Sequence, residues 1–244
     1  MHNSDSGRKK LRRFFSLLIC MITVSCLFIT CSVSADSDSY TIGDEFLFGH
    51  YEQDNDDRTN PKKEDIAWIV IDIDSEGDSD KLLLLSKYAL DNTPYQSNGS
   101  STTWASSQMR EWLNGIFLKT AFTSDEIDMI VETTIENNPG HHFPKVDSGS
   151  ITKDKLFLLS EYEASDSYTS KDIRQCIATK YAQGRGTWVD CDNLCAWWLR
   201  TPGCSASNAM YVVTDGHTVD TGFNVSRLVC GVRPALWIDL GKAE

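Results

Sequence analysis

Polar side chains that could hold a ligand are concentrated in the segment from Cys204 to Arg227. The candidate ligand-binding residues there carry hydroxyl, amide, carboxylate and imidazole groups, and they are Ser205, Ser207, Asn208, Asp215, His217, Asp220 and Asn224. Such groups, close to a tryptophan-rich stretch, are typical of sites that bind a sugar or a peptide. Because turns are polar in most proteins, the same residues also fit solvated loops without a ligand.

Signatures of catalysis are absent from the sequence. It contains no G-x-S-x-G, no H-E-x-x-H, no P-loop and no dinucleotide-binding glycine pattern. The 35 acidic residues allow many carboxylate pairs, so no particular pair indicates a glycosidase. We therefore assign no catalytic residue and no cofactor, and an extracellular hydrolase stays an alternative to a binding protein.

One acidic stretch resembles a calcium loop. Acids alternate from Asp72 to Asp78, and Gly77 stands at the sixth position. The twelfth position is Leu83, where such loops need a bidentate glutamate, and the flanking residues predict strands rather than helices. We expect a solvated hairpin turn here, and whether the protein binds a metal stays open.

Cysteine usage predicts disulfides in the last third of the chain. Eight cysteines are present, and the five outside the first 35 residues are Cys176, Cys191, Cys195, Cys204 and Cys230. In an exported protein these predict two disulfides and one unpaired thiol, with the connectivity left open. Their spacing lacks CxxC and a histidine partner, which disfavours a zinc site.

Two similar strings, WWLRTPG and GVRPALWI, mark the C-terminal part of the sequence. Each places an arginine next to or near a proline and a tryptophan, and the residues concerned are Trp197, Trp198, Arg200, Pro202, Gly203, Gly231, Arg233, Pro234 and Trp237. A guanidinium can donate to several main-chain carbonyls or to a carboxylate at once. We expect Arg200 and Arg233 to hold the fold together rather than to contact a ligand.

The amino terminus resembles a secretory signal. A basic segment, Arg8 to Arg13, precedes an apolar run to about Cys31, and Val33-Ser34-Ala35 suits cleavage before Asp36. An uncleaved membrane anchor is the alternative. We expect a signal peptide at 1–35, a short tether at 36–39 and one domain at 40–244, located outside the cell or on its surface.

The charge of the chain excludes two classes of partner. Residues 1–35 carry five basic residues and one acid, so the formal charge of −12 becomes −16 for residues 36–244. Nucleic acids and anionic membranes attract clustered lysine and arginine, which this segment lacks. We expect no nucleic-acid partner, and membrane contact only through an uncleaved N-terminal segment.

Apolar patterns predict one α+β domain with antiparallel sheets and two main helices. Strands are expected at 46–48, 66–73, 81–88, 155–159, 209–213, 217–221 and 236–238, with Asp215-Gly216 as a tight turn. One helix is expected to follow Thr102-Thr103 and to stop at Asn114-Gly115. Thr123 and Glu126 form a capping-box pattern for a second helix.

Eight strings occur in the order found in an uncharacterised family of exported and multidomain bacterial proteins, which this chain resembles over about residues 40–240. They are FGHYEQ, IAWIVID, LLLLSKYALDNTPY, TWASSQMREWLNGIFLKTAFTSDEI, KLFLLSEYEA, WWLRTPG, AMYVVTDGHTVDTG and GVRPALWI. The resemblance implies no activity, because that family has none established.

The final third is also remotely similar to C-type-lectin-like folds, which include the formylglycine-generating enzyme. The similarity is carried by Gly231-Val232-Arg233-Pro234. It implies a C-type-lectin-like C-terminal meander, although the calcium-binding strings of lectins do not occur. From these features we expect a non-catalytic module that binds an extracellular glycan or protein through its C-terminal loops; a structural surface protein is a further alternative.

Overall fold

The computed structural model describes residues 40–56, 62–76 and 80–242, which belong to one compact unit, Ser34–Glu244. The predicted signal peptide and tether lie outside the described residues. The strands are β1 (Glu45–Tyr51), β2 (Glu64–Asp74), β3 (Lys81–Ser86), β4 (Thr133–Ile135), β5 (Thr152–Asp154), β6 (Trp197–Pro202), β7 (Asn208–Val212), β8 (Thr218–Asn224) and β9 (Ala235–Asp239). The α-helices are α1 (Gln108–Trp112), α2 (Leu118–Ala121), α3 (Ser124–Met129), α4 (Lys171–Arg174) and α5 (Lys180–Gly184); η2 (Trp104–Ser106) and η5 (Leu240–Lys242) are 3₁₀ turns, and η3 (Leu113–Phe117) and η4 (Glu163–Ser167) are π-helical.

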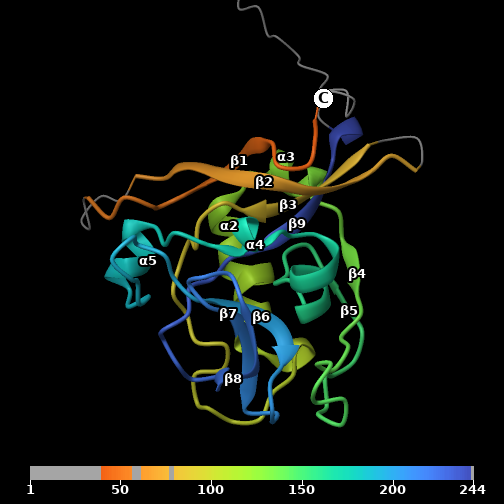
Figure 1. Cartoon of the computed structure of the whole chain (residues 1–244). Coiled ribbons are helices and arrows are strands. Elements are labelled where there is room, and N and C mark those ends of the chain that lie inside the picture. Colours follow the sequence, from red (N-terminus) through yellow and green to blue (C-terminus); the bar gives the residue numbers. More distant parts are fainter. Residues whose placement is uncertain (1–39, 57–61, 77–79, 243–244) are drawn as a thin grey trace, which may run out of the picture. The chain divides into compact units, whose positions relative to one another are not determined.

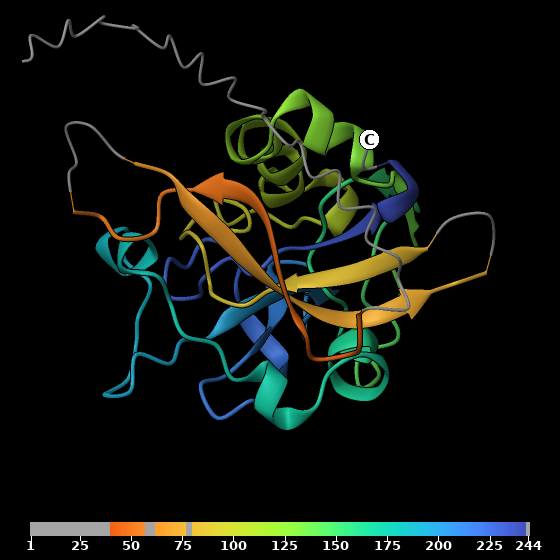
Figure 2. The same ribbon diagram turned by 90° about the horizontal axis from the view of Figure 1, so that it is seen from above.

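A four-stranded antiparallel sheet, in the order β1-β2-β3-β9, forms one layer of the unit (Figure 1). The hairpin of β2 and β3 confirms the strands predicted from the two apolar runs, and Leu82 to Leu85 are all buried. The sheet curls, and seen from above β1 crosses β2 (Figure 2). The curl coincides with a bulge in β1, where Gly49 has φ +72° and its α-carbon faces the ring of Phe122.

The last strand of the chain completes this first sheet. β9 pairs with β3 antiparallel, with Leu82 opposite Ile238 and Leu84 opposite Leu236. The apolar sequence of β9 predicts a strand, but the prediction did not identify its partner about 150 residues earlier. Through this pairing the C-terminal signature segment is joined to the N-terminal hairpin.

A second antiparallel sheet, β6-β7-β8, forms a separate layer (Figure 1). All six residues of β6, WWLRTP, are buried, which explains the unbroken apolar and aromatic sequence around Arg200. β7 and β8 confirm the predicted hairpin around Asp215-Gly216, where Gly216 has φ +84°. The mixed composition of antiparallel sheets and few helices agrees with the predicted α+β class.

The first predicted helix is longer and less regular than its sequence suggests. Thr103 caps η2 and Ser107 caps α1, but the chain continues through Asn114-Gly115 as π-helical η3 and then α2. The predicted stop at Asn114 is wrong because its side chain makes tertiary bonds. It donates to the Leu156 carbonyl at 2.8 Å and accepts from the Lys155 N–H at 2.9 Å.

The second helix begins as predicted, whereas one expected strand does not form. Thr123 and Glu126 make both bonds of the capping box at the start of α3. Residues 155–159 were expected to form a strand, but the strand there is β5, Thr152–Asp154, and Phe157 makes only an isolated bridge with Ala235. The apolar residues of this segment are buried by packing instead of by pairing.

The five cysteines are free thiols, which corrects the prediction of two disulfides. Cys176, Cys195 and Cys230 are buried, and Cys191 and Cys204 are exposed. The loops expected to need disulfides are held by hydrogen bonds between main-chain groups, among them the Cys195 N–H donating to the Cys176 carbonyl at 2.8 Å. Main-chain hydrogen bonds, together with the packing of Cys176, Cys195 and Cys230 in the core, therefore hold this region in the structure.

None of the helices in the described ranges is long and apolar enough to cross a membrane.

Candidate functional site

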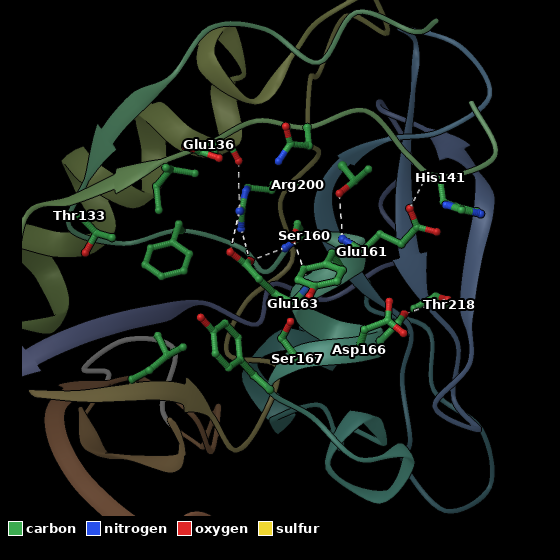
Figure 3. Close-up of a pocket in the computed structure, with 18 of the residues that line it drawn as sticks. Thr133, Glu136, His141, Ser160, Glu161, Glu163, Asp166, Ser167, Arg200 and Thr218 are labelled. Carbon is green, nitrogen blue, oxygen red and sulfur yellow. Dashed lines mark hydrogen bonds and ion pairs between the residues drawn. The ribbon is translucent and has the colours of Figure 1, made fainter. Parts of the chain in front are cut away.

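A cleft of about 960 Å³ lies where the two sheets meet the segments around β4 and η4. Its walls come from β4 and the loop to His141, from residues 157–168, from two residues of β6, and from single residues of β3, β8 and β9. Segments far apart in the sequence thus converge on one cavity. Figure 3 shows the polar side chains that point into it.

Arg200, at the end of β6, occupies the floor of the cleft and is nearly buried. Its guanidinium contacts both carboxylate oxygens of Glu163, with Nη2 2.7 Å from Oε1 (Figure 3). It also donates to the main-chain carbonyls of Leu158 at 2.8 Å and Glu136 at 3.3 Å. One side chain therefore ties three walls of the cleft together.

Glu163 is positioned by a local motif that the sequence analysis missed. The Ser160 N–H donates to Glu163 Oε2 at 2.7 Å, and the Glu163 N–H donates to Ser160 Oγ at 3.1 Å. This is a capping box of the S-x-x-E type, present in the string SEYE at the start of the helical turn that leads into η4. The spacing of Ser160 and Glu163 could have located this wall of the site.

Glu161 and His141 meet at the rim. The His141 N–H donates to Glu161 Oε2 at 2.9 Å, and the Glu161 N–H donates to Thr201 Oγ1 at 2.8 Å (Figure 3). Gly140 precedes His141, and a β-carbon at this glycine would lie 2.1 Å from the Met210 side chain. The close approach of the chain to Met210 explains the glycine and fixes the loop that carries His141.

The electrostatic character of the cleft is acidic. Its lining includes the four carboxylates of Glu136, Glu161, Glu163 and Asp166, against the single guanidinium of Arg200. Since Arg200 is already paired with Glu163, the remaining groups repel anions. The cleft is suited to a neutral or amine-bearing ligand.

Aromatic faces stand beside these polar groups. The Tyr162 ring is 68 % exposed, and Tyr168 and Trp237 are partly buried. Burial raises the pKa of Tyr168, and the charges of Asp72 and Glu163 raise it further, so its hydroxyl stays protonated. Exposed or half-exposed rings beside carboxylates and hydroxyls can stack on an apolar ligand face while fixing its polar groups.

The loop residues proposed from the sequence are not gathered in this cleft. Ser205 and Asn208 bond to each other at 3.0 Å, and Asn224 accepts from Ser226 at 2.7 Å. Asp215 and His217 lie 3.0 Å apart at the exposed β7–β8 turn. Ser205, Asn208, Asp215, His217 and Asn224 therefore make contacts within local turns.

Asp220, in β8, contacts a residue next to the rim of the cleft without lining it. Asp220 Oδ2 is 2.8 Å from His142 Nδ1, and His142 follows the rim residue His141. Thr218, two residues before Asp220, lines the cleft itself. None of the loop residues predicted from the sequence to bind a ligand lines this cleft, and Asp220 approaches it only through His142.

A smaller apolar hollow of about 380 Å³ lies elsewhere on the second sheet. Tyr211 and Phe223 stack there at a centroid distance of 4.0 Å, and Trp188 beside them is 59 % exposed. Arg227 is the charged residue of its lining. Because it contains no carboxylate, it differs chemically from the large cleft.

The remaining signature residues pack in the core. Arg233 is fully buried and donates to the carbonyls of Ser86 and Ile173, each at 2.8 Å. Its guanidinium lies over the Trp197 ring, and Pro202 and Pro234 are buried with Trp198. Close packing accounts for the two glycines, since a β-carbon at Gly203 would lie 2.4 Å from the Thr221 carbonyl oxygen and one at Gly231 would lie 2.6 Å from Ala89.

Comparison with known proteins gives a family but no activity. The chain matches no curated protein and no solved structure. The model of one family, Domain of unknown function (DUF6273), matches residues 79–240, a stretch that holds the large cleft and both signature strings. The chain therefore belongs to this family.

Proposed function

We propose that this chain is an exported or cell-surface binding module, without catalytic activity, that holds a glycan in the large cleft. The observation that carries the proposal is the combination of exposed or partly buried aromatic rings with hydroxyl, amide and carboxylate groups in one cavity of about 960 Å³. A cavity of this size is in the range that binds small ligands. Export is supported by the signal-like N-terminal sequence and by the acidic composition of the rest of the chain.

The chemistry of the lining favours carbohydrate over other ligands. Thr133, Ser165, Ser167 and Thr218 supply hydroxyls, and Asn138 supplies an amide. Such groups exchange hydrogen bonds with sugar hydroxyls, while the Tyr162 ring offers a stacking face. A protein is the alternative ligand for the same cleft. An unstructured peptide with basic side chains would complement the negative charge of its carboxylates.

The sign of the charge narrows the class of glycan. Glu161 and Asp166 are not engaged by a cation in the described part of the chain, so a uronic or sialic acid would meet like charge. Neutral and amine-bearing sugars avoid this repulsion. We therefore propose a neutral or amino-sugar polymer as the ligand.

A hydrolase is the second candidate function, favoured by the same carboxylates. Glycosidases use two acids across a cleft, one of which must donate a proton. Glu163 is the more buried acid, but both of its oxygens are bonded to Arg200, so neither is free to reach a glycosidic oxygen. Glu161 and Asp166 are the pair that a hydrolase would use here.

The lectin-like relationship remains part of this proposal. It is supported by the Gly231-Val232-Arg233-Pro234 string and by the C-terminal antiparallel sheet β6-β7-β8. The proposed site differs from the loops expected at first, because it lies beside η4 rather than at the β7–β8 turn.

A glycan array with matched aromatic variants tests the proposal. We expect the protein to bind neutral or amine-bearing glycans and Tyr162→Ala to weaken binding at least about fivefold, since stacking is worth about 1 kcal/mol or more. Trp188→Ala is the control, because it removes an equally exposed ring outside the cleft. Binding lost only in Trp188→Ala would place the site in the smaller hollow, and release of shorter glycans that Asp166→Asn abolishes would indicate the hydrolase.

A further inference from the structure

Three carboxylates gather at the loop that follows β1, away from the residues that line the large cleft. One ligand oxygen from each of Glu52, Asp54 and Glu64 lies within 4.8 Å of the others. Glu52 and Asp54 alternate along the loop, and Glu64 is the first residue of β2. The hairpin thus brings Glu64 next to Glu52 and Asp54, which precede it by 12 and 10 positions.

Main-chain donors fix each carboxylate through one oxygen. The Asn55 N–H donates to Glu52 Oε1 at 2.7 Å, and the Gln53 N–H donates to Glu64 Oε2 at 2.7 Å. The Asp56 N–H donates to Asp54 Oδ1 at 2.8 Å. The orientation of the three side chains is therefore set by the loop before any ligand arrives.

The second oxygen of Glu52 is the feature that points to a ligand. Glu52 is only 8 % exposed, and its Oε2 is buried and has no hydrogen-bond partner. A buried carboxylate oxygen without a donor or a cation is costly, because it has lost its water and gained nothing in exchange. None of the ion pairs formed among the described residues involves Glu52, Asp54 or Glu64.

We propose that Glu52, Asp54 and Glu64 form a binding site for a calcium ion. Carboxylate oxygens are the preferred ligands of hard divalent cations. Calcium–oxygen distances of about 2.3–2.6 Å allow ligands on opposite sides of the ion to be about 5 Å apart. The three oxygens, within 4.8 Å of one another, therefore fall inside the span of one calcium ion, which accepts irregular arrangements of oxygen ligands, whereas magnesium demands near-ideal octahedral geometry.

The bound ion would stabilise the hairpin and its contact with α5. The carbonyl of Gln53, between two of the ligands, accepts from the Tyr181 N–H at 3.0 Å, and its side chain donates to the Asp65 carbonyl at 2.9 Å. Ordering this loop with calcium therefore fixes both the β1–β2 connection and the start of α5. The site is independent of the glycan proposed for the large cleft.

Calorimetric titration of the chelator-treated protein with calcium chloride tests the site. We expect one ion per chain, saturation below about 1 mM as in extracellular calcium modules, and a melting temperature that rises with calcium. Glu52→Gln and Glu64→Gln should each weaken calcium binding at least about tenfold. Both variants should fold without calcium, because each substitution removes one of three carboxylates that repel one another.

Glu76→Gln is the matched control, since it removes one charge from the acidic turn at the other end of β2. It should leave calcium affinity unchanged. The absence of both binding heat and a melting shift at about 10 mM calcium would overturn the proposal. Unaltered binding in folded Glu52→Gln, or magnesium binding as tight as calcium binding, would overturn it as well.

Discussion

Arg200 and Glu163 form a two-pronged ion pair at the floor of the large cleft, with Arg200 Nη2 2.7 Å from Glu163 Oε1 and the second prong from Nη1 to Oε2. The two residues come from β6 and η4, 37 positions apart. Arg200 also has a buried Nε without a partner, so its charge depends on Glu163 for compensation. The ion pair shapes the floor of the cleft. Because Arg200 carries the only guanidinium among the lining residues, no other arginine is left there to bind an anion.

Glu163→Gln is expected to lower the free energy of unfolding by about 3 kcal/mol, because it leaves Arg200 buried without a counter-charge. Urea denaturation measures the change. Glu161→Gln makes the same chemical change two residues earlier, where the carboxylate accepts from the His141 N–H and pairs with no cation, and should cost less than about 1 kcal/mol. Equal losses in the two variants would show that the ion pair adds no stability.

Arg233→Ala is expected to destabilise the protein by about 3 kcal/mol or more, since it deletes two charge-assisted bonds to carbonyls and the contact with Trp197. Arg233→Lys should recover only part of this loss, because an ammonium cannot make the fork. Arg227→Ala, at an exposed position, serves as the control. A stable Arg233→Ala protein that no longer binds glycan would show a direct binding role instead.

The sequence predicted those parts of the fold that depend on neighbours in the chain. Thr123 and Glu126 mark the start of α3, and Asp215-Gly216 marks the β7–β8 turn, because capping boxes and tight turns are local. The pairing of β9 with β3 was not predictable in the same way. It depends on long-range packing, which the pattern of Leu236 to Ile238 does not specify.

The candidate site was predicted less well for the same reason. Its floor combines Glu163 with Arg200, and its rim combines Glu161 with His141, 20 positions away. Contacts between segments so far apart in the chain leave no pattern that a single sequence shows. Asn114 shows the reverse failure, since a local stop signal was overridden by its tertiary bond to Leu156.

Thiol titration checks that the cysteines are free. Cys191 and Cys204 are exposed and Cys176, Cys195 and Cys230 are buried, so in protein that begins at Asp36 a thiol reagent should modify about two groups in the folded state and five in denaturant. Cys191→Ser and Cys204→Ser should each remove one fast-reacting group. Fewer than five thiols in protein denatured under non-oxidising conditions would show that a disulfide forms after all.

Alkaline pH should destabilise the fold through buried acids that stay protonated. Burial raises the pKa of Tyr95 well above its ordinary 10.0, and burial likewise raises that of Cys230 above 9.0. The unfolded chain releases these protons first, so the free energy of unfolding falls as pH rises above about 9 for the thiol and 10 for the phenol. Each proton contributes a slope of about 1.4 kcal/mol per pH unit.

Urea denaturation between pH 8 and 11 tests this with Tyr95→Phe. At pH 8 the variant should be less stable by about 1 kcal/mol, because it lacks the bond to the Arg200 carbonyl. Above pH 10 its free energy of unfolding should fall less steeply with pH. A slope above pH 10 that is the same in Tyr95→Phe and in the unsubstituted protein would rule out Tyr95 as a source of the effect.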